Sequence, residues 1–454
     1  MLQRRKPVFY NPEWDGYFTE DKNYYQETLK KEPRRDPLDD KIDVDVCIIG
    51  GGFTGVSTAY QLRNSGLKVA LIERHEIGWG ASGRCGGQVL PGYNPYTQNL
   101  QQKYGDEKTK MLWDIALKGV NIVKGIYAEH NIDCDFKNGA FYVARDAYES
   151  EEIHEYARNV DEFYQYPIEF KDKAAISSML GTDIYDSGIY LPQAGHFHPL
   201  KYLKGLAKVT DQYAQIFESC PAEAIQRKGD GYIVYVPNGQ IRTKTLVLCG
   251  DSYLGNLVPS LRRKYVLIRN AIIGTEGLPA NTDVLPSDAC VFEVSQHMNY
   301  YRKGVEGSFL IGAGDIILQG LHGAVTQDKI TSVLVNDMIS IYPSLKDAKI
   351  EYKWGGYIGV TNSLLPNVGK LDDHVYYANG FSGHGVNVTH AVGELLAQAI
   401  SGQNEDYKIF DIIRNASYPG DGKWDRYLGY AGLQMINAKY EIEKAWDKVV
   451  HKKK

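Results

Sequence analysis

Two glycine-rich turns, far apart in the chain, hold the residue types that bind phosphate groups. The first, Gly50-Gly51-Gly52-Phe53-Thr54-Gly55, fits the pattern GxGxxG and follows an apolar run at 44–49. The first glycine of such a pattern allows a tight turn, the second lets a pyrophosphate approach the backbone, and the third lets the helix pack close to the strand. Glu73, about 20 residues further on, would accept the hydroxyls of an adenosine ribose. The spacing predicts a dinucleotide site.

A loop of small residues follows and would run along a flat ligand while donating backbone N–H groups to it. It spans 77–89, and its candidate cofactor-binding residues are Gly80, Ala81, Ser82, Arg84, Cys85, Gly86, Gly87 and Gln88. The second turn opens another helix, whose positive end would face the ligand. Its candidates are Gly380, Phe381, Ser382, Gly383, His384, Gly385 and Val386. Two such turns around one ligand favour FAD over NAD, because a reduced flavin carries negative charge at its N1/O2 edge.

The elements that must position these turns alternate between strands and helices. A strand at 44–49, a helix at 56–64 and a strand at 68–73 form a βαβ unit with a right-handed crossover. Further on, the pattern predicts a long helix at 106–129, a mostly β stretch at about 265–317, a strand at 374–378 and a helix at 389–401. The predicted fold class is α/β, with a Rossmann-type FAD-binding domain interleaved with a mixed-β substrate domain.

The same pattern divides the chain into segments. The FAD-binding domain takes 42–134, 195–264 and 355–405, and the substrate domain takes 135–194 and 265–354. Residues 1–41 are polar and proline-containing, and we expect a surface arm that would cover a neighbouring subunit if the protein is a homo-oligomer. Residues 406–454 are expected to form a helical extension.

Composition excludes several classes of protein. The 454 residues are 43% hydrophobic, and 51 Lys and Arg against 56 Asp and Glu give a net charge of −5, without the basic face of a nucleic-acid binder. No apolar run approaches the ~18 residues of a transmembrane helix, and no secretory signal is evident. The six cysteines form no CxxC pair, which is consistent with a reducing cytoplasm. His196 and His198 lack a third nearby ligand, so no metal site is expected.

Taken together, these motifs resemble the D-amino-acid-oxidase-like FAD-dependent oxidoreductases. The resemblance rests on the two turns, the glycine loop, the run His196-Phe197-His198-Pro199 and the run from Leu248 to Gly255. It implies FAD, held noncovalently or covalently, and oxidation of a C–N bond by hydride transfer to flavin N5. The implied substrate is a small amine or amino-acid derivative, of the γ-glutamylputrescine type. Arg74, Ala222 and Gly250 complete the candidate cofactor-binding residues.

Three residues are candidates for the catalytic side of the site: Arg302, Tyr301 and Trp354. Arginine binds carboxylates through two parallel hydrogen bonds, and the resemblance implies an arginine at this place in members that oxidise glycine and other amino acids. A surface ion pair is the alternative for Arg302. Trp354 and Tyr357 would wall the pocket, or else belong to the core. Replacing Arg302 by alanine is expected to raise the substrate KM while FAD stays bound.

Some residues depart from the family pattern. Asn387 stands where sarcosine-oxidising members carry a lysine, which argues against a small N-methyl amino acid. Those members also use a lysine beside the flavin, on a strand that matches about 309–312. No lysine lies in that strand here, which argues against direct reaction with oxygen, and the expected electron acceptor is oxygen or a carrier. Cys85 is either a buried small residue or a point of covalent flavin attachment. Two other functions stay open: a pipecolate-, proline- or sarcosine-like dehydrogenase passing electrons to a quinone or other carrier, and a non-catalytic or RNA-modifying flavin-binding protein.

Overall fold

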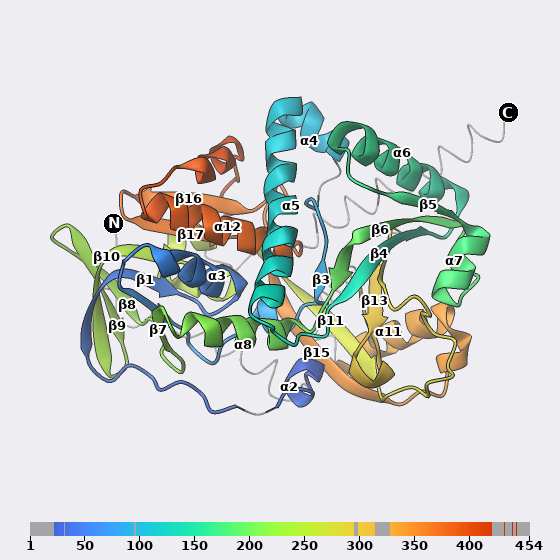
Figure 1. The fold of residues 1–454 in the computed structure, drawn as a ribbon, viewed down its shortest axis with the longest axis horizontal. Coiled ribbons are helices and arrows are strands. Elements are labelled where there is room, and N and C mark those ends of the chain that lie inside the picture. The colour runs from blue at the N-terminus through green and yellow to red at the C-terminus, as the bar shows by residue number, and fades with distance from the viewer. Residues whose placement is uncertain are drawn as a thin grey trace.

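The computed structural model describes residues 22–30, 32–94, 97–294, 298–313 and 327–419, and positions 431, 438 and 442. Most of the predicted N-terminal arm, up to residue 21, and most of the predicted C-terminal extension lie outside these residues. Two sheets form the scaffold and lie in the two halves of the molecule (Figure 1).

The first sheet has eight strands and the Rossmann-type arrangement. The order along its main path is β16-β17-β10-β1-β2-β7, and β8 and β9 extend it beside β10. Four pairings are parallel: β1 with β2, β1 with β10, β10 with β17, and β2 with β7. The strands are β1 (Lys41–Ile49), β2 (Val69–Ile72), β7 (Ala214–Phe217), β8 (Ala224–Lys228), β9 (Gly231–Val236), β10 (Gly239–Leu248), β16 (Asn367–Asp372) and β17 (Val375–Asn379).

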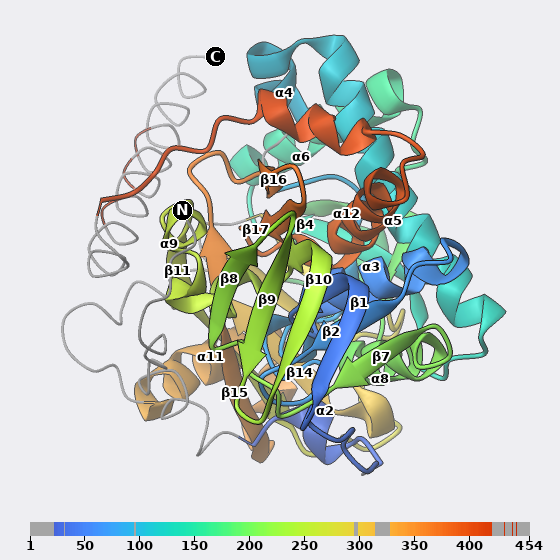
Figure 2. The same cartoon turned by 90° about the vertical axis from the view of Figure 1, so that its left-hand side faces the viewer.

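Both faces of this sheet are buried, which is why β1 reads as an uninterrupted apolar run. Val46 and Ile48 enter one hydrophobic core, and Cys47 and Ile49 enter another on the opposite face. Helices cover the first core, and the β8–β9 hairpin lies over the second (Figure 2). The helices are α3 (Phe53–Gln61), α5 (Asp106–Glu129), α8 (Pro199–Thr210) and α12 (Gly385–Ile400).

The second sheet has nine strands in the order β15-β11-β14-β13-β12-β4-β6-β3, with β5 beside β6. All its pairings are antiparallel except that of β12 with β4. The strands are β3 (Gln88–Val89), β4 (Lys137–Ala144), β5 (Glu169–Asp172), β6 (Ser187–His196), β11 (Val266–Thr275), β12 (Cys290–Glu293), β13 (Asn299–Lys303), β14 (Phe309–Ala313) and β15 (Ile350–Val360). Further helices are α2 (Tyr24–Glu27), α4 (Thr97–Tyr104), α6 (Ala147–Tyr164), α7 (Lys173–Leu180), α9 (Pro259–Arg262) and α11 (Gln327–Ile341).

The predicted fold class is confirmed: a parallel-rich α/β unit is interleaved with a mixed, mainly antiparallel sheet. The predicted domain limits stay a proposal, and strand pairing refines them at two places. β3 lies within the segment assigned to the FAD-binding domain but pairs with β6 of the second sheet. β15 begins at Ile350, before the limit placed at 355. Among the described residues, no helix is long and apolar enough to cross a membrane.

Candidate cofactor and active site

A cavity of about 950 Å3 lies between the two sheets. On the side of the first sheet it begins at the carboxyl ends of the strands, where Ile49, Ile72 and Cys249 line it. Ligands of open α/β sheets bind in the crevice outside these strand ends. On the other side the lining comes from β4, α6, β11, β12, β13 and β15. The cavity therefore joins a nucleotide-type crevice to a chamber on the second sheet.

The first glycine turn is packed too closely for side chains. Gly50 has a φ of +113°, and a Cβ there would lie 2.7 Å from the carbonyl oxygen of Cys249. A Cβ on Gly55 would lie 2.0 Å from the carbonyl oxygen of Gly50, so this glycine sets how closely α3 approaches the strand. α3 begins after Gly52 without a side-chain cap. Its positive end therefore faces the crevice, as an anion site requires.

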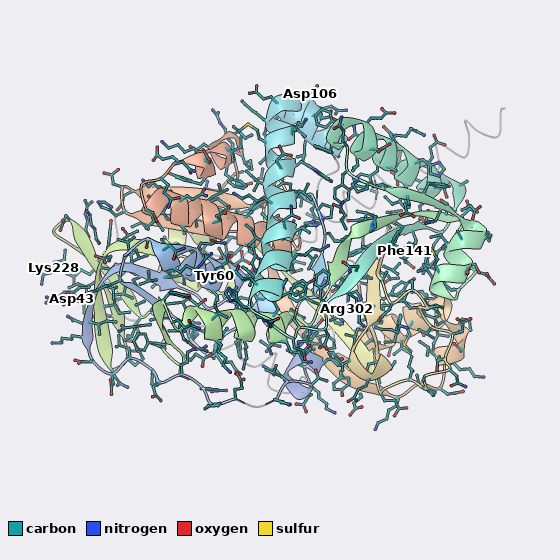
Figure 3. The ribbon with its side chains drawn as sticks, in the orientation of Figure 1. Asp43, Tyr60, Asp106, Phe141, Lys228 and Arg302 are labelled. Atoms are coloured by element: carbon teal, nitrogen blue, oxygen red, sulfur yellow. The ribbon has the colours of Figure 1, made fainter. Side chains whose placement is uncertain are left out.

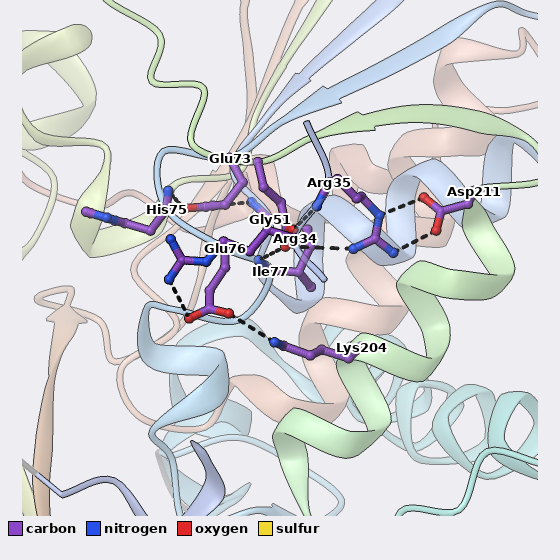
Figure 4. Close-up of polar contacts among 10 residues, drawn as sticks. Arg34, Arg35, Gly51, Glu73, His75, Glu76, Ile77, Lys204 and Asp211 are labelled. Carbon is purple, nitrogen blue, oxygen red and sulfur yellow. Dashed lines mark hydrogen bonds and ion pairs between the residues drawn. The ribbon is translucent and has the colours of Figure 1, made fainter. Parts of the chain in front are cut away.

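Glu73 lines the cavity at the end of β2, and its carboxylate is held in place by the backbone (Figure 4). Its Oε2 accepts a hydrogen bond of 2.7 Å from the N–H of Gly51, and its Oε1 accepts one of 2.9 Å from the N–H of His75. Burial raises the pKa of Glu73, while these two N–H groups act in the opposite direction. Carboxylate oxygens accept more than one hydrogen bond, so the role predicted for Glu73 at a ribose is compatible with these contacts.

Residues 80–88 form the glycine loop, and side chains from distant elements hold its carbonyl groups. The indole Nε1 of Trp354 donates to the carbonyl of Arg84 at 3.0 Å. Nε of Arg302 donates to the carbonyl of Gly86 at 2.7 Å. Asn23, near the N-terminus, donates from Nδ2 to the carbonyl of Gly83 at 3.2 Å. The backbone path of the loop is thus fixed from behind.

The second glycine turn is fixed by an aspartate that the sequence analysis did not include among the candidates. Asp251 follows β10, lines the cavity and accepts a hydrogen bond of 2.5 Å from the N–H of Gly380. Burial raises the pKa of its carboxyl group. α12 then starts at Gly385, with His384 before it and no side-chain cap. A second helix N-terminus therefore opens at the cavity.

The structure brings almost all the predicted cofactor-binding residues together on this cavity. The residues that line it are Gly50, Gly52, Phe53, Thr54, Glu73, Arg74, Gly80, Ala81, Ser82, Arg84, Cys85, Gly86, Gly87, Gln88, Ala222, Gly250, Phe381, Ser382, Gly383, His384, Gly385 and Val386. Gly55 and Gly380 lie behind the lining and shape the two turns.

The three predicted catalytic residues do not lie on the cavity lining, although Arg302 was expected to bind the substrate carboxylate and Trp354 to wall the pocket. Arg302, Tyr301 and Trp354 are not part of the cavity lining. Tyr301 points into the core on the far side of β13, and its hydroxyl donates to that of Tyr185. Arg302 and Trp354 are buried behind the glycine loop, and Figure 3 shows Arg302 between the two halves of the molecule. Tyr357, the other aromatic candidate, does line the cavity.

The chamber on the second sheet is aromatic. Tyr142 lies 6.0 Å from Tyr156 and 5.5 Å from Phe292, measured between ring centroids, and Phe292 lies 6.1 Å from Tyr300. These four rings, all on the cavity lining, form what we call the aromatic wall. The hydroxyl of Tyr300 donates to Oδ1 of Asn270 at 2.6 Å.

Two carboxylates, those of Glu152 and Glu293, share this part of the lining. Glu293 is 3% exposed, and its Oε1 accepts hydrogen bonds from Arg145 at 2.6 Å and from the Tyr185 hydroxyl at 2.6 Å. Asn299 donates to its Oε2 at 3.0 Å. Among the described side chains of the second sheet and α6, the lining includes neither lysine nor arginine. The chamber therefore offers aromatic faces and acids.

Comparison with known proteins places the chain in a family. Residues 45–399 match the DAO family of FAD dependent oxidoreductases, and the chain belongs to this family. It is 30% identical over 402 residues to gamma-glutamylputrescine oxidoreductase of Escherichia coli (strain K12), covering 88% of this chain and 93% of that one. It is 29% identical to probable oxidoreductase OrdL of Haemophilus influenzae, covering 88% and 92% of the two chains.

Solved structures share the fold. Glycine oxidase from Bacillus cereus matches with a TM-score of 0.67 at 21% identity, covering 81% of this chain and 97% of that one. L-proline dehydrogenase from P. horikoshii matches with a TM-score of 0.65 at 20% identity, covering 82% and 98%. The protein is therefore an FAD-dependent oxidoreductase acting on amines or amino acids, with FAD as its cofactor.

The site itself fits FAD. Three buried polar atoms on lining residues have no hydrogen-bond partner among the residues that the structure describes: Nε2 of Gln88, the hydroxyl of Tyr93 and Nε2 of His384. Buried polar groups are normally paired, so these atoms indicate a ligand with its own donors and acceptors. Burial lowers the pKa of His384 to about 4, so its ring is neutral at pH 7. Gln88 and His384 belong to the glycine loop and the second turn.

Proposed function

We propose that the protein oxidises the C–N bond of an extended alkyl amine, of the γ-glutamylputrescine type. The observation that supports this best is the aromatic wall with Glu152 and Glu293 beside it, on a lining where no described side chain of the second sheet or α6 is lysine or arginine. In a small amino acid the carboxylate adjoins the carbon to be oxidised, so it would need a cationic partner within this chamber. In γ-glutamylputrescine an alkyl chain separates the reacting amine from the α-carboxylate of the glutamyl group, so only the amine and its alkyl chain enter the chamber, where ring faces and carboxylates suit them.

One relative supports the same substrate class. The name of the Escherichia coli relative, gamma-glutamylputrescine oxidoreductase, states a long amine as its substrate.

Such a molecule would lie with its alkyl chain along Tyr142, and with its amine end over the ring of Phe292 and toward Glu293. Asn387, at the start of α12, donates to the carbonyl of Ala116 at 3.0 Å and is engaged in joining α12 to α5.

When bound, FAD supplies the hydride acceptor, N5 of its ring system. The protein's part is to orient the amine and exclude water. Tyr300, held by Asn270, and Tyr357 lie on the cavity lining and would orient the carbon next to nitrogen. The positive N-terminal ends of α3 and α12 would stabilise the negative charge of the bound cofactor. Hydride transfer requires a neutral amine, so deprotonation of the substrate in solution precedes it and no protein base is needed.

Strand β14 supports a proposal on the electron acceptor. Its five residues, Phe309 to Ala313, are all buried and include no lysine. The resemblance links fast reaction with oxygen to a lysine at this place. We therefore propose that a carrier accepts the electrons. A dehydrogenase for proline, pipecolate or sarcosine would share this feature, but its substrate carboxylate would find no described cation on the second-sheet part of the lining.

The aromatic wall provides a test by substitution. Phe292→Leu removes a ring and keeps an apolar side chain. Loss of a desolvated cation–π contact of ~1–2 kcal/mol predicts a rise in the KM for γ-glutamylputrescine of about tenfold. Phe170→Leu is the matched control, because Phe170 is 49% exposed on β5 and does not line the cavity. Equal KM values in both variants, or a higher kcat/KM for sarcosine than for γ-glutamylputrescine in the unaltered protein, would contradict the proposal.

A further inference from the structure

The N-terminal segment at residues 22–25 reaches the back of the glycine loop. Tyr24 and Tyr25 are 1% and 0% exposed, although they lie in the polar stretch of sequence that precedes β1. The ring of Tyr25 lies 5.5 Å from that of Trp354 and 5.0 Å from that of His198, between centroids. Ordering these residues costs conformational entropy, which the burial of the two rings must offset. The segment is therefore a packed part of the fold.

This segment is connected to the loop in two ways, directly through Asn23 and indirectly through Arg302. Asn23 donates directly to the carbonyl of Gly83 at 3.2 Å. Tyr25 acts through Arg302: its hydroxyl accepts from Nη2 of Arg302 at 2.9 Å, and Nε of the same guanidinium donates to the carbonyl of Gly86 at 2.7 Å. Nη1 of Arg302 donates to the carbonyl of Lys303 at 2.9 Å. The guanidinium is thus held by neutral oxygen acceptors on three sides.

The charge of Arg302 makes the Tyr25 contact important. Arg302 is 4% exposed, and within the described part of the chain no carboxylate pairs with it. A buried cation depends on its hydrogen bonds for the solvation that water would otherwise provide. Without the hydroxyl of Tyr25, Nη2 would lose its acceptor, and the guanidinium would be free to turn away from Gly86.

The next part of the same segment braces the other end of the loop region (Figure 4). Arg35 forms a bidentate ion pair with Asp211, with distances of 2.8 and 2.7 Å. The N–H of Arg35 donates to Oε2 of Glu218 at 2.7 Å, and Oε1 of Glu218 accepts from the N–H of Ile77 at 2.6 Å. The segment therefore contacts the chain that leads from Glu73 into the glycine loop, as well as the loop itself.

We propose that Asn23 and Tyr25 are part of the cofactor site, because they position the backbone of the glycine loop against FAD through Gly83 and, by way of Arg302, Gly86. Both are positioning residues, since neither lines the cavity. This role concerns FAD and holds whichever amine is the substrate. It also gives the polar N-terminal segment a function within its own chain.

Three variants of the FAD-loaded protein test the proposal. Tyr25→Phe removes only the hydroxyl. Asn23→Asp removes the donor to Gly83 but keeps Oδ1. This oxygen caps the N-terminus of α2 by accepting a hydrogen bond of 3.0 Å from the N–H of Tyr25. Tyr24→Phe is the matched control, because the Tyr24 hydroxyl bonds instead to the backbone of Val305, outside the loop. The readouts are hydrogen–deuterium exchange of the amides of residues 80–88, the visible circular dichroism of the bound flavin, and Tm.

Tyr25→Phe and Asn23→Asp are expected to raise exchange of the loop amides about tenfold, which corresponds to ~1.4 kcal/mol, and to change the flavin dichroism. Tyr24→Phe is expected to lower Tm about as much as Tyr25→Phe does, because each loses one buried hydroxyl, but to leave loop exchange within about twofold of the unaltered protein. Unchanged loop exchange in both Tyr25→Phe and Asn23→Asp would overturn the proposal. So would an equal increase in Tyr24→Phe, because that result would show general destabilisation.

Discussion

Replacing Arg302 by lysine separates two roles for this residue, contact with the substrate and support of the glycine loop. Lysine keeps the positive charge but has its donors on one atom. It cannot reach both the carbonyl of Gly86 and the hydroxyl of Tyr25, which Arg302 contacts through Nε at 2.7 Å and Nη2 at 2.9 Å. The variant therefore loses at least one hydrogen bond from a charged group, worth ~1.5–3 kcal/mol, and leaves a buried acceptor unpaired.

We take ~2–4 kcal/mol as the total cost, since the two losses overlap. The assay measures FAD retained by the protein after gel filtration, and the KM for the amine with FAD in excess. The expected result is FAD loss at least ten times faster than in the unaltered protein, with KM changed by less than about threefold. Lys303→Arg, on the same strand, is the control. A KM raised more than tenfold with normal FAD retention would refute the reasoning and show that Arg302 contacts the substrate.

Three further predictions follow from the packing, the ion pair and the buried histidines. Gly55→Ala should yield protein without bound flavin, because its Cβ would lie 2.0 Å from a backbone oxygen; Gly125→Ala, where a Cβ meets no atom within 4 Å, should leave flavin absorbance unchanged. Glu293→Gln should lower Tm and raise the amine KM, because Arg145 loses a charged partner at 2.6 Å and the chamber loses an acid. The control Glu169→Gln, at an exposed residue, should do neither. Equal effects in the two variants would contradict the role of Glu293 in the substrate chamber. Burial lowers the pKa of five histidines, to about 3 for His196 and His198 and to about 4 for His75, His384 and His390. Since the unfolded chain takes up these protons near pH 6.5, the free energy of unfolding measured in urea should fall as pH decreases from about 6.5 to 4, and a flat profile would contradict this.

The cofactor half of the site could be predicted from the sequence because its signals are local. The apolar run of β1, the glycines after it and Glu73 report a strand, a turn and a second strand that are neighbours in the chain. Glycine is required at Gly50 by a positive φ and at Gly55 by close packing, so residue type and position carry the same information.

The substrate half could not be read in this way, because it depends on which face of a strand is turned to the cavity. Tyr300 and Tyr301 are adjacent in β13 and point to opposite faces, and only Tyr300 lines the cavity. Arg302 lies on the same face as Tyr300, but the N-terminal segment, distant in sequence, holds it behind the glycine loop. Asp251 had a weaker signal, an acid three residues after the end of a buried strand, and its partner Gly380 is 129 residues away.

The measurement that tests the central claim most directly is the absorbance of the bound flavin under anaerobic conditions after an amine is added. The amines are γ-glutamylputrescine, putrescine, sarcosine, pipecolate and proline. We expect rapid loss of the oxidised flavin band with γ-glutamylputrescine, and slow or no loss with the other four. Rapid loss with a cyclic amino acid and none with γ-glutamylputrescine would contradict the proposed substrate class, and no loss with any amine would contradict amine oxidation itself.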